Sequence, residues 1–425
     1  MDELLYLVHR IPYPPDKGDK IRSYHLLKHL TRRYRVHVGA FVDDAEDWRH
    51  ADALRSLCAT VHLVGIRPGL AKLGALSGLL TGEALTLGYY RHPDMAAWVR
   101  QRLDAGVRRV VCYSSAMARF VIDTEGVRRV MDFVDMDSDK WRQYAATRPW
   151  PLSWLYRREA ERLLAWERRV AAEFDASLFV SEREAADFRS AAPESSQRIG
   201  WYDNGVDADY FSPERAYDNP YPPGIEPVVF TGAMDYWPNV DAVTWFAREV
   251  LSAVRQRRPT AVFYVVGSRP AAQVQALARL PGITVTGRVP DVRPYLAHAA
   301  AAVAPLRIAR GVQNKVLEAM AMARTVVVSP QALEGIRTVA GEEVLLADGP
   351  KGFIEATLRA LNGPTLGPAA RRRVVHDYAW DACLARLDAL IDARTPLPTP
   401  PQAMHSEDEA EATGAAGQVT MERTT

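Results

Sequence analysis

Short runs of apolar, mainly β-branched residues alternate with longer amphipathic stretches along most of the chain. Six runs in the first half predict strands (LLYLVH, VHVGAFV, VHLVGI, RRVVCYS, RRVMDFV and ASLFVS), and so do six in the second half (PVVFTG, AVFYVVG, ITVTG, AAAVAP, TVVVS and EVLLA). The stretches between them predict helices, most clearly at 20–30, 154–173, 239–255, 271–280 and 312–323. Alternation of this kind indicates an α/β protein with parallel sheets covered by helices on both faces.

The two series of strands predict two doubly wound, Rossmann-like domains, and the length of 425 residues agrees with two domains. Residues 202–227 are rich in Pro, Gly, Asn and Asp and lack periodicity, which is typical of a connecting segment. We predict domains over 1–205 and 206–365, a C-terminal helix over 366–395 and a disordered tail over 396–425. Ligands of doubly wound sheets bind outside the carboxyl ends of the strands, so a ligand is expected in the cleft between the domains.

Charge and cysteine content exclude several classes of protein. The net charge of +1 is spread along the chain and gives no indication of a nucleic-acid partner. Cys58, Cys112 and Cys383 lie far apart in apolar runs, which favours free thiols in a reducing compartment over disulfides or a metal site. The N-terminal residues enter a strand-like run instead of a signal peptide, and no apolar run is long enough to span a bilayer. We therefore expect a cytoplasmic protein.

Residues 69–90 form a Leu-rich segment with two interpretations. Its leucines stand at helical spacing beside two basic residues: Leu70, Leu73, Leu76, Leu79 and Leu80, with Arg67 and Lys72. A helix of this kind docks on a membrane surface, which would place the protein at the inner face of the membrane. Alternatively, the helix packs on its own domain, which the short and weakly basic polar face favours.

The stretch RGVQNKVLEAMAMARTVVVS, residues 310–329, predicts a polar loop, a short helix and a buried strand. An apolar stripe on the helix should face the sheet and leave Asn314, Lys315 and Glu318 together on the other side, near the helix start. Gly311 allows close approach of the backbone, and the first-turn amides favour a phosphate, which Arg310 and Lys315 would clamp. Glu318 would then accept hydrogen bonds from vicinal hydroxyls such as those of a ribose, or it merely pairs with Lys315 on a solvated face.

A second candidate phosphate contact follows the first predicted strand, in the sequence PYPPDKGDKIRSYH, residues 12–25. Backbone amides at Gly18 would cradle a phosphate oxygen, with Lys17, Lys20 or Arg22 as cationic support. The spacing by itself favours a simple turn.

Three carboxylates, Asp135, Asp137 and Asp139, alternate after another predicted strand, in VDMDSDKW. Alternating carboxylates can share a hard divalent cation, so a metal site is one interpretation. An N-cap of the following helix by Asp137 or Ser138 is another. The cations needed to hold a phosphate are already present elsewhere, and we predict no metal.

Several motifs resemble one family in their order along the chain. FTGAMDYWPNVDAVTWF, FYVVGSRP, VTGRVPDVRPYL, VAPL and VLEAMAMARTVVVSPQALEGI resemble the nucleotide-binding half of the retaining GT-B glycosyltransferases of glycosyltransferase family 4. FVSEREAADF and YDNGVDADYFSP resemble that family's segment leading to the hinge. PYPPDKGDKIRSYHLLKHL and MDFVDMDSDKWRQYA resemble, more narrowly, the sugar transferases associated with PEP-CTERM/exosortase exopolysaccharide systems. The resemblance covers nearly all of the chain except the tail, and it implies the GT-B architecture with a C-terminal helix that crosses back to the N-terminal domain.

The resemblance also implies roles for single residues. Glu318 corresponds to the second glutamate of the family's paired-glutamate motif, which binds the nucleotide ribose, whereas the position of the first glutamate holds Arg310. This departure puts the usual contact to the donor sugar in doubt and adds a cation where the diphosphate lies. The implied catalytic or acceptor-side residues are Arg310, Lys315, Asp135 and Asp137. The implied donor-binding residues are Gly18, Lys20, Arg22, Gly232, Arg288, Val289, Gly311, Val312, Asn314 and Glu318, with Arg288 and Val289 on the side of the base.

The function that the resemblance implies is metal-independent transfer of a sugar, with retention, from a nucleotide diphosphate donor to a hydroxyl of a glycan or lipid-linked glycan, without a cofactor. Because the first glutamate is absent, a degenerate scaffold that binds nucleotide sugar in a polysaccharide assembly is the alternative. An epimerase or a phosphorylase would need acid/base carboxylates beside the sugar or a cofactor lysine, and the sequence gives no position for either.

Overall fold

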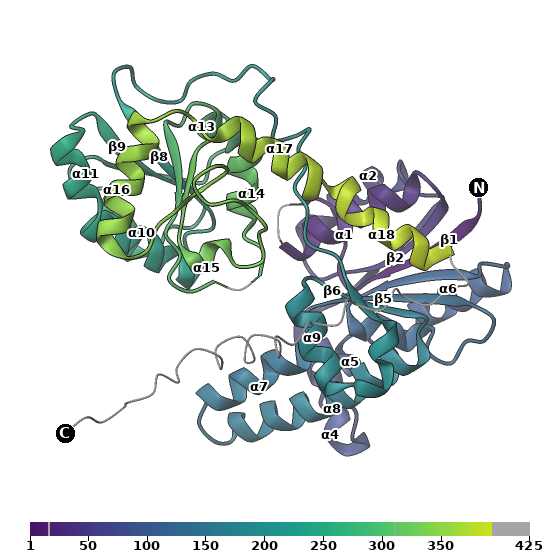
Figure 1. Cartoon of the computed structure of the whole chain (residues 1–425). Helices are drawn as coiled ribbons and strands as arrows, with labels where there is room; N and C mark the ends of the chain where they lie inside the picture. The colour runs from purple at the N-terminus through teal and green to yellow at the C-terminus, as the bar shows by residue number, and fades with distance from the viewer. Residues whose placement is uncertain (16–17, 310, 393–425) are drawn as a thin grey trace, which may run out of the picture.

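The computed structural model describes residues 1–15, 18–309 and 311–392, so Arg310 and the tail predicted over 396–425 lie outside the described residues. The chain forms two lobes, each built around a parallel sheet (Figure 1). The predicted fold class, two Rossmann-like domains with parallel sheets, is confirmed.

The N-terminal sheet has the strand order β3-β2-β1-β4-β5-β6-β7, and every neighbouring pair is parallel. Its strands are β1 (Glu3–Val8), β2 (Arg35–Val42), β3 (Thr60–Gly65), β4 (Arg109–Tyr113), β5 (Arg128–Val134), β6 (Ala176–Phe179) and β7 (Ile199–Trp201). The last strand was not predicted, because its three residues, Ile-Gly-Trp, are too few to show a period. In β1, the side chains from Leu4 to Val8 are all fully buried, since helices cover both faces of the sheet.

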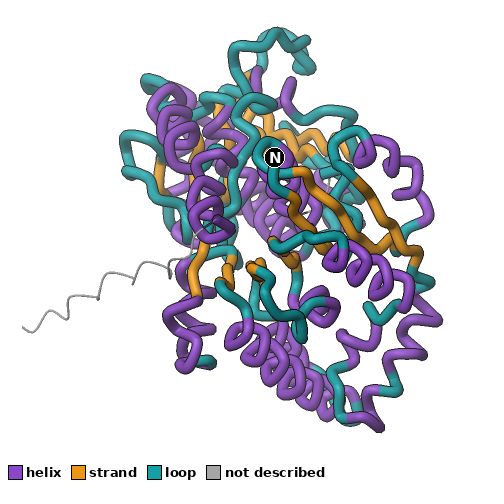
Figure 2. Tube along the Cα trace, turned by 90° about the vertical axis from the view of Figure 1, so that its right-hand side faces the viewer, coloured by secondary structure: helices purple, strands orange, loops and turns teal. Residues whose placement is uncertain are grey.

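The helices of the N-terminal lobe flank this sheet (Figure 2). They are α1 (Gly18–Thr31), α2 (Ala51–Arg55), α3 (Pro68–Ala75), α4 (Gly78–Thr81), α5 (Leu85–Tyr89), α6 (Pro93–Asp104), α7 (Asp137–Thr147), α8 (Leu152–Glu173) and α9 (Glu182–Ala191), with 3₁₀ turns η1 (Ala45–His50), η2 (Ser115–Phe120) and η3 (Pro193–Arg198). Helices α7 and α8 form an antiparallel hairpin that extends from the lobe beneath the C-terminal lobe in Figure 1.

The C-terminal sheet has the order β10-β9-β8-β11-β12-β13, again parallel throughout. Its strands, β8 (Glu226–Thr231), β9 (Ala261–Val266), β10 (Ile283–Gly287), β11 (Ala301–Ala304), β12 (Val326–Val328) and β13 (Leu345–Leu346), coincide with the six predicted runs. The helices are α10 (Trp237–Glu249), α11 (Leu251–Arg257), α12 (Ala272–Leu277), α13 (Arg293–Ala297), α14 (Asn314–Ala321), α15 (Pro330–Leu333) and α16 (Gly349–Asn362). The single helix predicted over 239–255 is interrupted at Val250, so it forms α10 and α11.

Two chain segments run side by side between the lobes. The connecting segment passes beside the start of α18 (Trp380–Asp392), where the amide of Val206 donates to the carbonyl of Tyr378 at 2.7 Å. Helix α17 (Gly367–Asp377) lies on the C-terminal lobe, and α18 packs its apolar side chains, including Leu384 and Leu387, into the core of the N-terminal lobe (Figure 1). The C-terminal helical region therefore links the two lobes.

Candidate functional site

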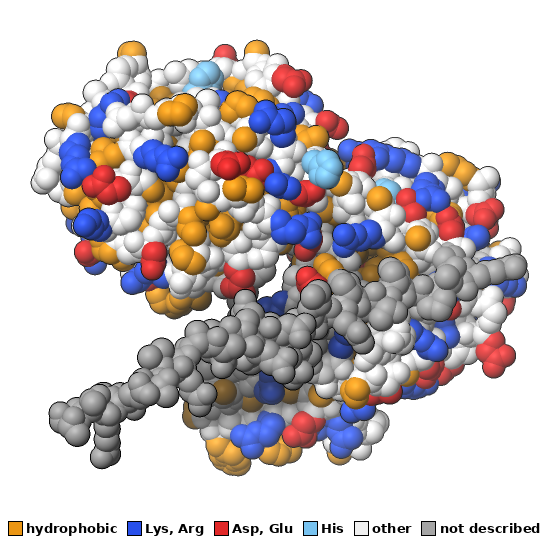
Figure 3. Space-filling view, viewed as in Figure 1, with side chains coloured by type: hydrophobic (Ala, Val, Ile, Leu, Met, Phe, Trp, Pro, Cys, Tyr) orange, Lys and Arg blue, Asp and Glu red, His pale blue; other side chains and the backbone are white. Residues whose placement is uncertain are grey.

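Each sheet reverses its strand order at one place, and such a reversal opens a crevice at the carboxyl ends of the strands. In the C-terminal lobe the reversal lies between β8 and β11, and in the N-terminal lobe it lies between β1 and β4. Arg183, which follows β6, forms an ion pair with Glu334, which follows β12 and α15. The carboxyl edges of the two sheets therefore face each other, and Figure 3 shows a hollow between the lobes.

Lys315 lies at the crevice of the C-terminal lobe, in the first turn of α14. Its ammonium donates to Oδ1 of Asn239 at 2.9 Å and lies 5.2 Å from the centre of the Phe230 ring. Asn239 in turn donates to the carbonyl of Ala233 at 2.9 Å, so the amide is fixed in orientation. Burial lowers the pKa of Lys315 to about 8, because charge is disfavoured away from water, and Glu318 opposes the shift.

Gly232 directly follows β8 and lies beside this lysine. A Cβ atom there would lie 2.8 Å from Nδ2 of Asn239 and 3.4 Å from Cε of Lys315, and φ at Gly232 is 153°. The backbone needs glycine here, both for its conformation and for the close approach of Asn239. Gly232, Asn239 and Lys315 therefore form one packed unit, of which the sequence predicted the first and the last.

Glu318 stands one helical turn after Asn314. Burial raises the pKa of Glu318 to about 7, and Lys315 opposes the shift. Because Lys315 donates to Asn239, the surface pair considered as the alternative is not the arrangement in the structure. Oδ1 of Asn314 is buried without a hydrogen-bond partner among the described residues. The carboxylate of Glu318 and the amide oxygen of Asn314 are both hydrogen-bond acceptors in the first two turns of α14.

The other residues predicted to bind the donor lie in two further loops of the C-terminal lobe. Gly311 adopts φ 62°, a left-handed conformation that favours glycine, and Val312 packs against the core of the lobe. Arg288, after β10, is exposed, and Val289 packs against the same core. Arg310, the second cation of the predicted clamp, is outside the described residues, so its predicted role stays a prediction.

Two residues of the N-terminal lobe that were predicted to bind the donor are instead buried in its interior. Lys20 and Arg22 are each only 1% exposed. The ammonium of Lys20 lies 2.8 Å from Oδ2 of Asp47, and Nε of Arg22 lies 3.0 Å from Oδ2 of Asp132. Cations that are buried and paired in this way have no free face for a phosphate, so their predicted role is replaced by a structural one. Gly18 is exposed at the start of α1, and Lys17, the remaining residue of this predicted contact, lies outside the described residues.

The ion pair of Arg22 is the centre of a buried network. The guanidinium stacks 3.6 Å from the centre of the Tyr202 ring and donates to the carbonyl of Tyr202 and to Oδ1 of Asn204, both at 3.0 Å. The hydroxyl of Tyr202 donates to Asp132, which also accepts the amide of Val134 at 3.1 Å. Val134 has φ 70°, a strained value for a β-branched residue. The network therefore ties the connecting segment to the backbone turn immediately before Asp135.

Asp135 and Asp137 share a lysine that the sequence reasoning did not single out. The ammonium of Lys140 donates to Asp135 at 2.8 Å and to Asp137 at 3.1 Å. Helix α7 begins at Asp137, but its N-cap position is Met136, so the predicted capping by Asp137 or Ser138 is not observed. Among the described residues, no group of three or more His, Cys, Asp or Glu side chains is arranged to hold a metal ion.

The first turn of α7 is anchored from below by Glu167. Its carboxylate accepts the amide of Ser138 at 3.2 Å and the hydroxyl of Ser138 at 2.5 Å. Burial, followed by the charge of Asp137, raises the pKa of Glu167 to about 8. Glu167 lies on the buried face of α8. A glutamate is rarely fully buried unless it is paired, so its place among apolar residues was a signal in the sequence that we did not use.

His9 and Arg10 follow β1 at the crevice of the N-terminal lobe. Arg10 donates to Asp19 at 2.7 Å and to Asp43 at 2.9 Å, and Nε2 of His9 lies 3.8 Å from Asp19. The His9 ring stacks on Tyr113, 5.8 Å between centroids, and burial lowers its pKa. The cation that the sequence reasoning overlooked here, Arg10, is thus held by two carboxylates.

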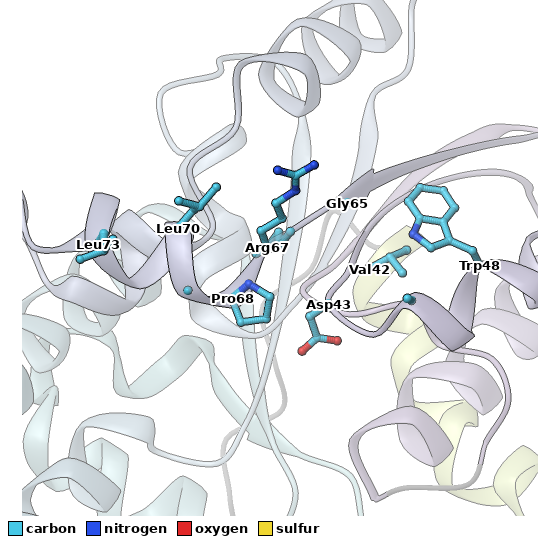
Figure 4. Close-up of a pocket in the computed structure, with 11 residues that line it drawn as sticks. Val42, Asp43, Trp48, Gly65, Arg67, Pro68, Leu70 and Leu73 are labelled. Carbon is cyan, nitrogen blue, oxygen red and sulfur yellow. The ribbon is translucent and has the colours of Figure 1, made fainter.

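A groove opens beside Asp43, between the ends of β2 and β3 and the helix α3 (Figure 4). Its volume is about 700 Å³, and its lining is mainly apolar and includes Trp48, Pro68 and Leu70, with Asp43 and Arg67 as the charged side chains. A groove with mainly apolar walls and few charged groups is typical of a small-molecule site. Its residues follow two neighbouring strands, β2 and β3, at the carboxyl edge of the sheet.

The C-terminal lobe is similar to a known protein family. Residues 226–363 match the family model described as glycosyl transferases group 1. This part of the chain is therefore similar to the glycosyl transferases of group 1. A search of curated proteins gives no match.

Solved structures match over both lobes. Sucrose-phosphate synthase from Thermosynechococcus elongatus has a TM-score of 0.62 at 16% identity, covering 91% of this chain and 98% of that one. HepE from Anabaena, in complex with UDP and glucose, has a TM-score of 0.61 at 13% identity, covering 91% and 98%. WaaG, a glycosyltransferase involved in lipopolysaccharide biosynthesis, has a TM-score of 0.60 at 15% identity, covering 92% and 100%. The fold is GT-B, and together with the domain match it supports the predicted enzyme class, a glycosyltransferase.

Proposed function

We propose that the protein transfers a sugar from a nucleoside diphosphate sugar to a hydroxyl group, without a metal and with retention at the anomeric carbon. The observation that carries the proposal is Lys315, a desolvated cation at the strand-order reversal of the glycosyl transferases group 1 domain, whose hydrogen-bond partner, Asn239, is neutral. A diphosphate beside it would favour the ammonium form and raise the lowered pKa again. Glu318 would accept hydrogen bonds from the ribose hydroxyls of the same nucleotide.

In the proposed reaction the bond between the anomeric carbon and the diphosphate oxygen breaks while the bond to the acceptor oxygen forms on the same face of the sugar. The proton of the acceptor hydroxyl passes to the departing phosphate. Negative charge grows on the diphosphate as it leaves, so Lys315, Arg310 and the first-turn amides of α14 stabilise the transition state more than the ground state. Closure of the lobes would exclude water, which otherwise hydrolyses the donor.

We assign the acceptor to the N-terminal lobe. Asp135 and Asp137 lie after β5 at its carboxyl edge, held by Lys140, and the apolar groove beside Asp43 is a second element of the same lobe. A glycan or lipid-linked glycan acceptor, and a place in exopolysaccharide synthesis, rest on the motif resemblance to family 4 and to the PEP-CTERM/exosortase-associated transferases.

The decisive experiment is calorimetric titration of the metal-free protein with UDP, GDP, ADP and inorganic phosphate. UDP is the first nucleotide to test, since the similar structure of HepE contains UDP and glucose. We expect one nucleoside diphosphate to bind, and Lys315→Ala to weaken it by about tenfold or more, equivalent to at least about 1.4 kcal/mol. Lys351→Ala, an exposed lysine on α16, is the matched control. Binding that requires a divalent ion, or that ignores Lys315, would contradict the proposal.

The alternative is a scaffold that binds the nucleotide sugar without turnover, and the observation that favours it is Arg310 in the place of the family's first glutamate. Slow hydrolysis of the nucleotide sugar in the absence of an acceptor separates the two functions. An enzyme releases nucleoside diphosphate at a rate that Lys315→Ala reduces, whereas a scaffold releases none above the rate in buffer.

A further inference from the structure

Two segments of the N-terminal lobe carry basic and apolar residues without a single carboxylate. Residues 66–82 contain Arg67 and Lys72 among many leucines. Residues 140–158 contain a lysine and four arginines together with three tryptophans and two tyrosines. A glutamate follows each segment directly, Glu83 after the first and Glu159 after the second.

Nine large apolar side chains of these two segments are exposed. In the first segment these are Leu70, Leu73, Leu76, Leu79 and Leu80, whose exposed fractions range from 40% to 94%. In the second they are Tyr144, Trp150, Leu152 and Trp154, from 43% to 80%. The interpretation of residues 69–90 as a helix that packs its leucines on its own domain is therefore wrong for these five leucines.

Contacts between α8 and the segment around α4 bring the two sets together. Arg158 donates to the carbonyls of Gly78 and Glu83, and Glu159 accepts the amides of Leu85 and Thr86 at 2.7 and 2.9 Å. Trp154 precedes Arg158 by one helical turn and shares its face of α8.

Trp154 thus shares a helix face with the residue that contacts α4, the helix that contains Leu79 and Leu80. Figure 3 shows apolar and basic side chains next to each other along the lower edge of this lobe. We call this combined face the Leu/Trp surface; it consists of the nine exposed apolar residues of both segments.

Basic side chains around the Leu/Trp surface are available to a ligand. Arg67, Lys72, Arg148 and Arg157 are exposed, and within the described parts of the chain none of them has a carboxylate partner. Lys140 and Arg142, nearer the crevice, differ because they pair with Asp135, Asp137 and Asp139. The unpaired cations therefore border the exposed apolar side chains.

We infer that the Leu/Trp surface docks the protein on the surface of an anionic lipid bilayer. Exposed leucines enter the acyl region, tryptophan and tyrosine lie at the headgroup level, and cations pair with anionic headgroups. None of the described helices has the length and apolar composition to cross a membrane, so the contact is peripheral. A protein partner fits less well, because leucine contributes few of the strong contacts in protein interfaces.

The docking surface adjoins the acceptor lobe's groove, since Leu70 and Leu73 belong to both. Docking would therefore hold the groove and the α7–α8 hairpin next to the headgroups. The inference rests on exposure, contacts and charge, and it does not depend on the proposed sugar transfer.

Flotation of the full chain with vesicles tests the inference. The probes are vesicles of phosphatidylcholine alone and of phosphatidylcholine mixed with phosphatidylglycerol, whose anionic headgroups attract Lys and Arg side chains. We expect binding to the anionic vesicles and at least about tenfold weaker partitioning to the neutral ones.

Three variants separate the contributions. Leu79→Ser/Leu80→Ser/Trp150→Ser should reduce partitioning by about tenfold or more, and Arg67→Glu/Lys72→Glu/Arg148→Glu/Arg157→Glu should abolish the preference for anionic vesicles. Arg279→Glu/Leu280→Ser, an exposed basic and apolar pair on the C-terminal lobe, is the control and should bind like the unchanged protein. Far-UV circular dichroism and melting temperatures verify that each variant is folded.

Two outcomes would overturn the inference. One is equal partitioning of the unchanged protein and the folded leucine variant, which would show that another face binds lipid or that none does. The other is a concentration-dependent dimer, measured by light scattering, that the leucine variant abolishes while vesicle binding is absent, which would make this face an interface between two copies. Nucleoside diphosphate titration of the same variants should be unchanged, so a failure here is distinct from a failure of the donor site.

Discussion

Cations at the two strand-order reversals differ in what holds them. In the C-terminal lobe, the amide of Asn239 is the hydrogen-bond partner of Lys315. In the N-terminal lobe, Lys20 and Arg22 each pair with a buried carboxylate. A cation whose partner is neutral keeps its charge available to a phosphate, whereas a cation paired with a carboxylate in the interior stabilises the fold. The partner, and not the residue type or its position after a strand, separates a ligand-binding cation from a structural one.

The largest effect is expected where a buried pair is broken. Asp132→Ala leaves Arg22 charged and unpaired in the interior, and we expect a loss of about 3–5 kcal/mol in the free energy of unfolding. Urea denaturation followed by fluorescence measures it. Asp132→Leu combined with Arg22→Met removes both charges and should recover much of the loss. A single variant that costs less than about 1 kcal/mol would mean that the network has no structural role.

Substitution of single lysines sharpens the comparison directly. Lys20→Ala leaves Asp47 without its partner and should lower the unfolding free energy by about 1–3 kcal/mol while nucleoside diphosphate affinity stays the same. Lys315→Ala should do the reverse, with stability within about 1 kcal/mol and affinity reduced about tenfold or more. Calorimetry measures the nucleoside diphosphate affinity of each variant, and urea denaturation measures its free energy of unfolding. If both variants lose affinity equally, the distinction between structural and ligand-binding cations fails.

The pH dependence of nucleoside diphosphate affinity separates Lys315 from other cations. The pKa of Lys315 is about 8 in the folded protein without ligand, below the usual value for lysine, so its ammonium is lost as the pH rises through about 8. We expect affinity to fall about fivefold between pH 7 and pH 9, since the neutral amine attracts phosphate weakly. Lys315→Arg should remove this dependence, because arginine stays charged. An unchanged pH profile in that variant would assign the dependence to another group.

The lowered pKa of Lys315 also makes the free energy of unfolding depend on pH. Between about 8 and the ordinary lysine pKa of about 10.5, the unfolded chain binds more protons than the folded one at Lys315, so stability rises with pH there. Below about 8 the cost of burying the ammonium is fully present. Glu318 acts oppositely: its pKa of about 7 lies above the ordinary value of about 4.5, so its contribution to stability decreases as the pH rises between these values.

The smallest effect concerns the support of Lys315. Gly232→Ala would force a Cβ atom to within 2.8 Å of Asn239, which displaces the amide that orients the lysine. We expect about threefold weaker nucleoside diphosphate binding, measured by calorimetry, because the lysine remains but is less well positioned. Gly349→Ala is the control, since its φ is 62° and a Cβ there meets no atom within 4 Å. If both variants behave alike, backbone strain and not the contact with Asn239 explains the effect.

The sequence by itself determined the fold class, because buried parallel strands leave continuous apolar runs that show without any tertiary information. All six strands of the C-terminal sheet and six of the seven in the N-terminal sheet were predicted, and only β7 was too short to show a pattern. The polar start of α14 was also visible, since one helical turn places Lys315 and Glu318 on one side of a helix.

Only the tertiary structure decided which of the predicted cations are available to bind a ligand. Asn239 stands 76 residues from Lys315, and Asp132 stands 110 residues from Arg22, so neither partner could be paired with its cation from local spacing. The Leu/Trp surface likewise combines two segments that are far apart in the chain. Periodicity reports which face of an element is buried, but the charge that meets a side chain comes from elements that only folding brings together.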